Sequence, residues 1–570
     1  MFKITIIDGY IDEPTCLGVP PYISPYPRYI TGCILKQDRK NQIYYYTIDQ
    51  IRQKNDLNFL LKNNLIILIA GTSVPGRYLA GYPISPNEIK KFLENIPVNK
   101  ILAGPAAKHG FGIQGGQKTY DSTLLKEIFD LIITGDPEIV IKNYLENNLK
   151  TKDLNISEKR KNAHTIKEYA NLGSQIVTQH PYYPNYIIAE IETYRGCPRT
   201  ITGGCSFCSE PSKGLPDFRP INDIVDEIQN LYKQGIRHFR LGNQPCIFSY
   251  QSIDAGKVEF PRPNPEALEE LFSKIRIVTP ELKTLHIDNA NPGVIARYPK
   301  DAEQIAKTIV KYHTPGDVAA MGIESADPVV IKSNNLKATP EESLKAIKLI
   351  NKIGSKRGNN GMPELLPGLN FVFGLEGETK NTFNLNYEFL KQILDENLLL
   401  RRINLRQVIP IPNTKMYRIG NKLVNKHKNL FKKFKNQVKE NIERPMLKKI
   451  LPQATIVKNV YTEKHDGKLT FARQLGSYPL LIGIPGVYNL KQFMDVKIVD
   501  YGYRSITAIP HPIDINIVQR ETIEAIPGIG KKRAIRILAN RPFKKQEDFL
   551  NIFDDPIIAK NILEFLSFSN

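Results

Sequence analysis

Two stretches of this chain alternate short β-prone runs with helical segments, and this alternation constrains the fold more than any other feature. In residues 1–150 the β-prone runs lie at 2–7, 42–48, 65–70, 100–103 and 131–134. In residues 186–412 they lie at 186–194, 236–241, 283–287, 317–323, 368–373 and 402–409. Strands that alternate with helices favour parallel sheets. The sequence therefore predicts an α/β protein with a doubly wound, Rossmann-like domain at 1–150 and a partial (β/α)6 barrel at 186–412.

Four further segments are predicted around these two units. Residues 151–185 are rich in Lys, Asn, Pro and Tyr, which predicts a linker. Residues 413–455 form a basic helical segment: twelve Lys or Arg and two acids lie between 413 and 450, half of the formal net charge of +20. Short β-prone runs split by glycines predict a small β-barrel at 456–517. Residues 518–570 predict a helix-hairpin-helix, whose turn holds Gly528 and Gly530, both expected to tolerate positive φ.

Three of the six cysteines lie close together, directly after the first strand of the predicted barrel: Cys197, Cys205 and Cys208. Three thiolates suit three irons of a [4Fe-4S] cluster and leave the fourth iron open for a ligand. In parallel barrels the loops at the carboxyl ends of the strands carry the active site. A zinc site would need a fourth ligand, and the nearest downstream candidates, His238 and Cys246, belong to no second paired motif. Six cysteines in 570 residues are too few for a disulfide framework.

The strand, the cysteine loop and the six-unit barrel together resemble the radical S-adenosylmethionine (SAM) superfamily. The C-x2-C half with Phe207 matches the family pattern, whereas the first gap is C-x7-C in place of C-x3-C. The resemblance implies that SAM binds the open iron and is cleaved reductively to a 5′-deoxyadenosyl radical. The loop at 374–379, Gly-Leu-Glu-Gly-Glu-Thr, is similar to a loop common in the family. The positions that the resemblance assigns to SAM binding are Gly242, Asn243, Gln244, Glu324 and Ser325.

The N-terminal domain resembles the cobalamin-binding domains that are fused to radical SAM barrels in archaeal and bacterial enzymes. The D-x-H-x-x-G motif of other cobalamin proteins is absent, as it commonly is in the fused class, and a domain that has lost the cofactor is the alternative. The resemblance implies a methyltransferase that acts on an unactivated carbon. The long cysteine loop resembles that of the glutamine C-methyltransferase acting on methyl-coenzyme M reductase. Glycines expected to seat the corrin are Gly71, Gly76, Gly110, Gly115 and Gly116.

RNA modification, by methylation or methylthiolation of tRNA or rRNA, is the second hypothesis. Residues 471–512 look like the TRAM barrel of RNA methylthiotransferases. This barrel, the basic segment and the helix-hairpin-helix all favour an RNA partner. The turn at Gly528 and Gly530, with Lys531 and Lys532, would expose backbone N–H groups and positive charge to phosphates. A methylthiotransferase would normally need a second cluster in its N-terminal domain, where only two cysteines lie. A nucleic-acid-binding protein without catalysis is the third hypothesis.

The sequence also predicts the surroundings in which the protein works. No run approaches twenty apolar residues, and residues 1–8 resemble a strand more than a signal peptide, which favours a cytoplasmic protein without membrane association. The expected partners are a macromolecular substrate, protein or RNA, and an external electron donor. The sequence assigns no further catalytic side chain.

Overall fold

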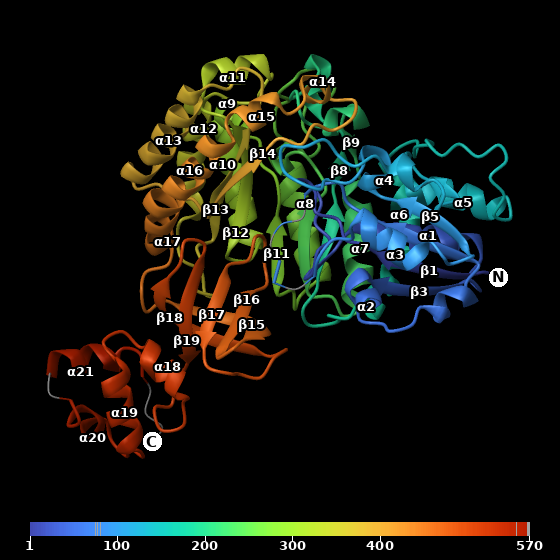
Figure 1. The fold of residues 1–570 in the computed structure, drawn as a ribbon. Coiled ribbons are helices and arrows are strands. Elements are labelled where there is room, and N and C mark those ends of the chain that lie inside the picture. The colour runs from blue at the N-terminus through green and yellow to red at the C-terminus, as the bar shows by residue number, and fades with distance from the viewer. Residues whose placement is uncertain (75, 77, 80, 554–555, 567–570) are drawn as a thin grey trace.

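The computed structural model describes residues 1–570 except 75, 77, 80, 554–555 and 567–570. It confirms a mixed α/β protein with parallel sheets and a small closed β-barrel. Figure 1 shows the N-terminal sheet and its helices beside the central strands, with the small barrel and the last helices below them. Among the described helices, none combines the length and the apolar character needed to cross a membrane.

The N-terminal sheet is fully parallel and has the strand order β3-β1-β4-β5-β6. This is a doubly wound order, and its direction reverses between β1 and β4, where such sheets form a ligand crevice beyond the carboxyl ends of the strands. All five strands lie within two residues of the predicted positions. Their bounds are β1 (Lys3–Asp8), β3 (Gln42–Thr47), β4 (Leu65–Ile69), β5 (Asn99–Ala103) and β6 (Leu131–Ile132).

Helices cover both faces of this sheet, and alternate residues of β4 enter two different cores. Leu65 and Ile67 pack in the core that also contains α1 and α5, whereas Ile66 and Leu68 pack in the core that contains α3. Side chains of a strand point alternately to its two faces, so this apolar run is buried on both sides. The helices are α1 (Pro25–Gln37), α2 (Ile48–Arg52), α3 (Pro86–Leu93), α4 (Pro105–His109) and α5 (Pro137–Glu146).

Residues 151–185, predicted as a linker, are folded in part as helix. They contain α6 (Lys167–Gly173) between two 3-10 helices at Ala163–Ile166 and Ser174–Gln179. Helix α6 crosses α1 closely at two glycines, because a Cβ at Gly32 or at Gly173 would overlap a backbone carbonyl of the other helix. The polar composition concealed a few apolar side chains, such as Tyr169 and Ile176, that are buried against α1 and its neighbours.

All six predicted strands of the central unit are present, as two parallel sheets that one bridge between Asn289 and Ala320 connects. The sheet orders are β11-β10-β7-β2 and β12-β13-β14. The short strand β2 (Tyr22–Ile23) comes from the N-terminal region but pairs with β7 and so adds an edge strand to the central sheet, which the sequence did not indicate. The other strands are β7 (Ile188–Glu192), β10 (His238–Gly242), β11 (Thr284–Ile287), β12 (Asp317–Glu324), β13 (Leu365–Phe373) and β14 (Arg402–Gln407). The helices are α7 (Ile221–Lys233), α8 (Pro265–Val278), α9 (Pro292–Arg297), α10 (Pro299–Tyr312), α11 (Pro328–Ser333), α12 (Pro340–Gly354) and α13 (Lys380–Asp395).

The basic segment is helical and amphipathic. Phe434 and Val438 of α16 are buried, and the ring of Phe434 contacts those of Phe373 and Phe383. Lys432 and Lys433 of the same helix are exposed. The segment comprises α14 (Lys415–Ile419), α15 (Lys422–Lys426), α16 (Lys428–Val438), a π-helical turn (Lys439–Glu443) and α17 (Arg444–Ile450).

The small barrel closes in the order β15-β16-β17-β19-β18. Two short helices follow it, α18 (Arg520–Ala525) and α19 (Lys531–Ala539), joined by a turn in which Gly528 has a φ of 87°. Gly530 has an extended backbone instead, so the turn uses the tolerance for positive φ at one of its two glycines. The barrel strands are β15 (Ile456–Asp466), β16 (Leu469–Gln474), β17 (Leu481–Pro485), β18 (Phe493–Tyr501) and β19 (Ser505–His511), and the last helices are α20 (Gln546–Leu550) and α21 (Pro556–Leu563).

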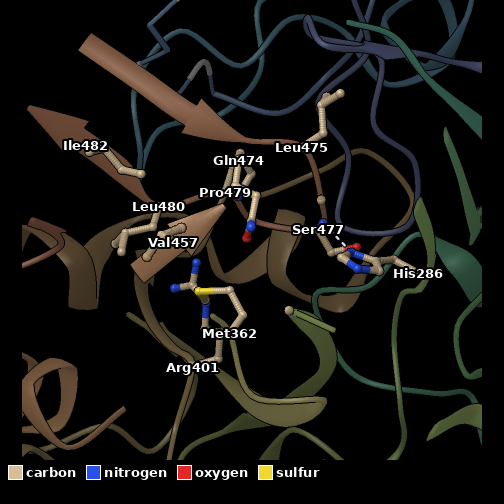
Figure 2. Close-up of a pocket in the computed structure, with 12 residues that line it drawn as sticks. His286, Met362, Arg401, Val457, Gln474, Leu475, Ser477, Pro479, Leu480 and Ile482 are labelled. Carbon is tan, nitrogen blue, oxygen red and sulfur yellow. Dashed lines mark hydrogen bonds between the residues drawn. The ribbon is translucent and has the colours of Figure 1, made fainter. Parts of the chain in front are cut away.

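A loop of the small barrel, residues 475–480, fastens this barrel to the central unit. Figure 2 shows its Ser477 against His286 of β11: the Ser477 N–H donates to His286 Nδ1 at 2.7 Å. Arg401 donates to the carbonyl of Tyr478 at 3.1 Å, and Tyr22 of β2 donates to the carbonyl of Gly476 at 2.7 Å. The pocket beside this loop lies at the amino-terminal ends of β12, β13 and β14. It is therefore at the opposite end of the strands from the cysteine loop, where structural contacts are expected in a parallel barrel.

Candidate functional site

The three-cysteine loop follows β7 and a two-residue strand, β8 (Tyr194–Arg195), at the carboxyl end of the central sheet. Cys197, Cys205 and Cys208 all line one pocket with an empty volume of about 530 Å³, part of it open to solvent. Residues between the first two cysteines form a 3-10 helix, Pro198–Thr202, that ends at two glycines with positive φ. This turn reverses the chain and returns Cys205 to the pocket that Cys197 lines.

The donor set of this pocket fits an iron–sulfur cluster. Among the residues that the structure describes, no three Cys, His, Asp or Glu side chains converge as they would around one metal ion. The three thiols instead share the walls of one pocket, as expected when each thiolate binds a different iron. A tetrahedral zinc ion would require its four ligands to meet at one point.

Burial controls the protonation of the three thiols. It raises the pKa of Cys197 to about 12 and also raises the pKa values of Cys205 and Cys208, because a buried thiolate loses its hydration. The positive charge of Arg199 partly offsets this effect at Cys205. Metal binding requires thiolates, so the assembly of a cluster here releases protons and is favoured as the pH rises.

Two cationic side chains that were not predicted from the sequence lie beside the thiols. Arg199 donates to the sulfur of Cys205 at 3.0 Å, and Lys337 lines the same pocket. Lys337 also pairs with Glu324, with 3.4 Å between Nζ and Oε1. Glu324 ends β12 with a φ of 63°, so its carboxylate is positioned by a backbone conformation that is uncommon for a non-glycine residue. No sequence spacing could have revealed Lys337, since it precedes α12 and reaches the site only through the fold.

The predicted SAM-binding turn after β10 reaches this pocket through its later residues. Pro245 and Cys246 line the pocket. Asn243 instead donates to Glu192 at 2.6 Å, and a Cβ at Gly242 would overlap the carboxylate of Glu190. The glycine at 242 is thus explained by close packing inside the barrel. The roles assigned to Gly242, Asn243 and Gln244 in SAM binding remain predictions.

Ser325 and the loop at 374–379 have structural contacts of their own. The hydroxyl of Ser325 accepts a hydrogen bond from the Asp327 N–H at 3.1 Å in the turn that precedes α11. Glu378 accepts from the Gly374 N–H at 2.6 Å and contacts His427 Nδ1 at 2.8 Å. The glutamate therefore closes its own loop and attaches the basic segment to the barrel. The role assigned to Ser325 in SAM binding stays a prediction.

The glycine loops predicted to seat a corrin lie beyond the carboxyl ends of the N-terminal strands. Glu13, after β1, accepts hydrogen bonds from the N–H groups of Thr72 and Ser73, so its carboxylate occupies the amides of the 71–76 loop. Within that loop Pro75 lies outside the described residues, and Gly76 is exposed. Gly71 packs against the backbone of residues 11–12, and Gly110 packs against Thr119 and Tyr120.

The second glycine loop crosses from the N-terminal domain to the barrel. A Cβ at Gly116 would overlap Val424 of α15, so this glycine permits a close approach to the basic segment. Gly115 lies opposite the last residue of β14: a Cβ built on it would be 3.8 Å from the Cβ of Gln407, with nothing closer outside its chain neighbours. Lys118 lies 4.3 Å from the ring centroid of Tyr417. The carboxyl ends of the two parallel units therefore face each other.

The residues predicted to contact phosphates lie far along the chain from this pocket. Gly528, Gly530, Lys531 and Lys532 are all exposed, whereas Ile529 between the glycines is buried. The turn is braced by Arg533, which donates to the Gly528 carbonyl at 2.8 Å. The structure thus leaves this turn and its two lysines accessible, and their contact with nucleic acid remains a prediction.

Comparisons with known proteins agree with this site. A model of the radical SAM superfamily matches residues 191–390, which include the three cysteines. An uncharacterized protein of Methanocaldococcus jannaschii is 50% identical over 512 residues, 89% of this chain and 92% of that protein. An uncharacterized protein of Archaeoglobus fulgidus is 44% identical over 536 residues, 94% of this chain and 95% of that protein.

More distant matches are also found. The tRNA-2-methylthio-N(6)-dimethylallyladenosine synthase of Agrobacterium fabrum is 27% identical over 220 residues, 38% of this chain and 40% of that protein. Among solved structures, the radical SAM methyltransferase TsrM of Kitasatospora setae is 14% identical with a TM-score of 0.47, covering 73% of this chain and 74% of that one.

The superfamily match and the archaeal relatives identify the chain as a member of the radical SAM superfamily, in one family with the two archaeal proteins. Enzymes of this superfamily use a [4Fe-4S] cluster and SAM. The chain is therefore a radical SAM enzyme with these two cofactors, and Cys197, Cys205 and Cys208 are the residues that fit the cluster.

Proposed function

We propose that this enzyme is a cobalamin-dependent radical SAM methyltransferase that acts on an unactivated carbon of a macromolecular substrate. The observation that carries the proposal is the meeting of two carboxyl ends, where Gly115 lies opposite Gln407 at the end of β14. A cofactor in the crevice of the doubly wound sheet would lie over the end of the barrel that holds the cysteines. Two cofactors and a substrate carbon can then share one space between the domains.

The chain offers residues for each ligand. Lys337 and Glu324 supply a positive and a negative group beside the thiols, which suits the carboxylate and the amino group of SAM. A Cβ at Gly115 would meet only Gln407, 3.8 Å from the Cβ of that residue, so the loop presents bare backbone toward the end of β14, where a flat macrocycle could pack. Cobalamin, when bound, would supply a methyl group carried on cobalt. The proline residues that line the pocket, such as Pro211 and Pro245, would exclude water from the reacting groups.

Replacement of Gly115 tests the cofactor. Gly115→Phe is expected to reduce corrinoid bound after anaerobic reconstitution by at least about tenfold, because an aromatic ring would fill the space between the domains. Gly115→Ala is the matched control and should bind as the unchanged protein does, since its added Cβ meets only ordinary contacts. The measurement is corrinoid absorbance after gel filtration. If the unchanged protein retains no corrinoid, or if the Phe variant binds normally, cobalamin in this crevice is refuted.

Modification of RNA is the second candidate, favoured by the exposed pair Lys531 and Lys532. The methylthiotransferase of Agrobacterium fabrum acts on tRNA by its name, and it is a distant relative. If these lysines contact phosphates, RNA binding should weaken steeply as the salt concentration rises. Replacement of both Lys531 and Lys532 by Ala should then reduce the magnitude of the slope of log K against log salt, where K is the RNA association constant, by about 1–2. The exposed pair Lys90 and Lys91 on α3, outside the segments expected to contact RNA, is the matched control.

The same binding measurement separates the two substrate classes. A protein substrate is supported if peptides bind and RNA shows no salt-sensitive affinity. A glutamine-containing peptide of methyl-coenzyme M reductase is the protein substrate to test first, because the cysteine spacing resembles that of its methyltransferase. Salt-sensitive RNA binding that depends on Lys531 and Lys532 would favour the RNA candidate instead.

A further inference from the structure

The insertion in the cysteine loop is a folded unit with its own hydrogen bonds. The Thr200 N–H donates to the Cys197 carbonyl at 3.0 Å, and the Gly204 N–H donates to the Arg199 carbonyl at 2.8 Å. Asn335, from the loop between α11 and α12, donates to the carbonyls of Thr202 and Gly204 at 3.1 and 3.0 Å. These bonds fix the insertion from within and from outside. A merely tolerated insertion would not need such contacts.

Arg199, the second residue of the insertion, is held on three sides and is only 3% exposed. Its Nε donates to Glu259 at 2.7 Å, and one terminal nitrogen donates to the side-chain oxygen of Asn335 at 3.0 Å. The other terminal nitrogen donates to the sulfur of Cys205 at 3.0 Å. A buried guanidinium is stable only where its charge is paired and its N–H groups are bonded, so this arrangement fixes the donor that points at Cys205.

A fixed cation at a cluster ligand changes the energy of adding an electron. The reduced cluster carries one more negative charge than the oxidised cluster, so a nearby positive charge stabilises the reduced form more. Hydrogen bonds to the sulfurs act in the same direction and are among the factors that set the potential of iron–sulfur clusters. Burial strengthens both effects, because little water screens the interaction between Arg199 and the sulfur of Cys205.

We propose that the long gap between Cys197 and Cys205 serves to place Arg199 against the sulfur of Cys205, and that this contact raises the reduction potential of the cluster. In the step concerned, an external low-potential donor loses one electron and the cluster gains it, and no covalent bond forms or breaks. The proposal rests on the assignment of the three cysteines as cluster ligands. It makes Arg199 a positioning residue that acts through the cluster.

The test is a redox titration of the reconstituted full-length chain with dithionite as reductant, followed by electron paramagnetic resonance. Arg199→Met is expected to retain the iron and sulfide content and to titrate at a more negative midpoint potential than the unchanged chain. Arg199→Lys keeps the charge but loses the planar guanidinium, so its midpoint potential is expected to lie between those of the unchanged chain and Arg199→Met. Arg297→Met is the matched control: Arg297 packs on Phe260, as Arg199 does, but pairs with Glu342.

Each result decides for or against the proposal. A normal potential in Arg199→Met, or an equal shift in Arg297→Met, would overturn it while leaving the cluster assignment intact. If Arg199→Met loses its iron, the Lys variant decides, and an unchanged potential there also overturns the proposal. If the unchanged chain assembles no cubane cluster, the ligand assignment fails, and this inference falls with the proposed function.

Discussion

Glu227→Ala is expected to lower the free energy of unfolding by about 3–5 kcal/mol, because it leaves two buried guanidinium groups without their shared carboxylate. Arg28 and Arg219 approach Glu227 to 2.9 and 2.6 Å, and all three side chains are fully buried. Burial alone would raise the pKa of Glu227, but the two arginines lower it below its usual value, which keeps the carboxylate charged. The measurement is urea unfolding followed by circular dichroism.

The triad of Arg28, Arg219 and Glu227 joins the N-terminal domain to the barrel. Arg28 lies on α1 of the N-terminal domain and also donates to the Ser24 carbonyl, whereas Glu227 lies on α7 of the barrel. We therefore expect limited proteolysis of Glu227→Ala to release the N-terminal domain from the barrel earlier than in the unchanged protein. The matched control is Glu270→Ala on α8, whose pair with Lys274 is exposed and should contribute little.

Two outcomes would contradict this account. A Glu227→Ala variant that unfolds like Glu270→Ala would show that the triad does not hold the domains together. Replacement of all three residues by apolar ones should restore much of the loss, because the cost lies in the unpaired charges. If the apolar triple variant is no more stable than Glu227→Ala, the loss comes from packing rather than from charge.

The strands of both parallel units could be predicted from the sequence, because their apolar runs are continuous and separated by helices. Runs such as 65–70 are buried on both faces, so a local pattern of residues contains the information. The pairing of β2 with the central sheet could not be predicted, since this strand is only two residues long and its place depends on where β7 lies. The helix α6 was missed for a related reason: its contact with α1 uses glycines, which carry no apolar signal.

The candidate site was predictable where ligands are adjacent in sequence and unpredictable where the fold brings them together. The three cysteines share one short loop, so their number and proximity indicated the cluster, although the first gap departs from the family spacing. Lys337 and Glu259 come from other loops and reach the thiols only after the βα units close. Arg199 was within the motif, but its sequence gave no reason to expect that it turns inward to a sulfur.

Replacement of any one of Cys197, Cys205 and Cys208 by Ser is expected to reduce bound iron from about four to less than about one per chain and to abolish SAM cleavage. A cubane held by three thiolates loses a third of its protein ligands in each variant, and the remaining thiols are too few to retain it. The three thiols line a pocket and are not packed inside the core, so the fold should tolerate serine at these positions. Iron and sulfide analysis after anaerobic reconstitution, with 5′-deoxyadenosine as the second readout, measures both effects.

Cys246→Ser is the control that makes this result specific. Cys246 lines the same pocket and is buried, but its sulfur accepts a hydrogen bond from the Asn291 N–H at 3.1 Å, a contact that serine can keep. We expect this variant to bind a full cluster and to cleave SAM. Loss of iron in Cys246→Ser would make Cys246 a fourth ligand, and the open iron that SAM requires would then be contradicted. Zinc in place of iron and sulfide in the unchanged chain would refute the cluster itself.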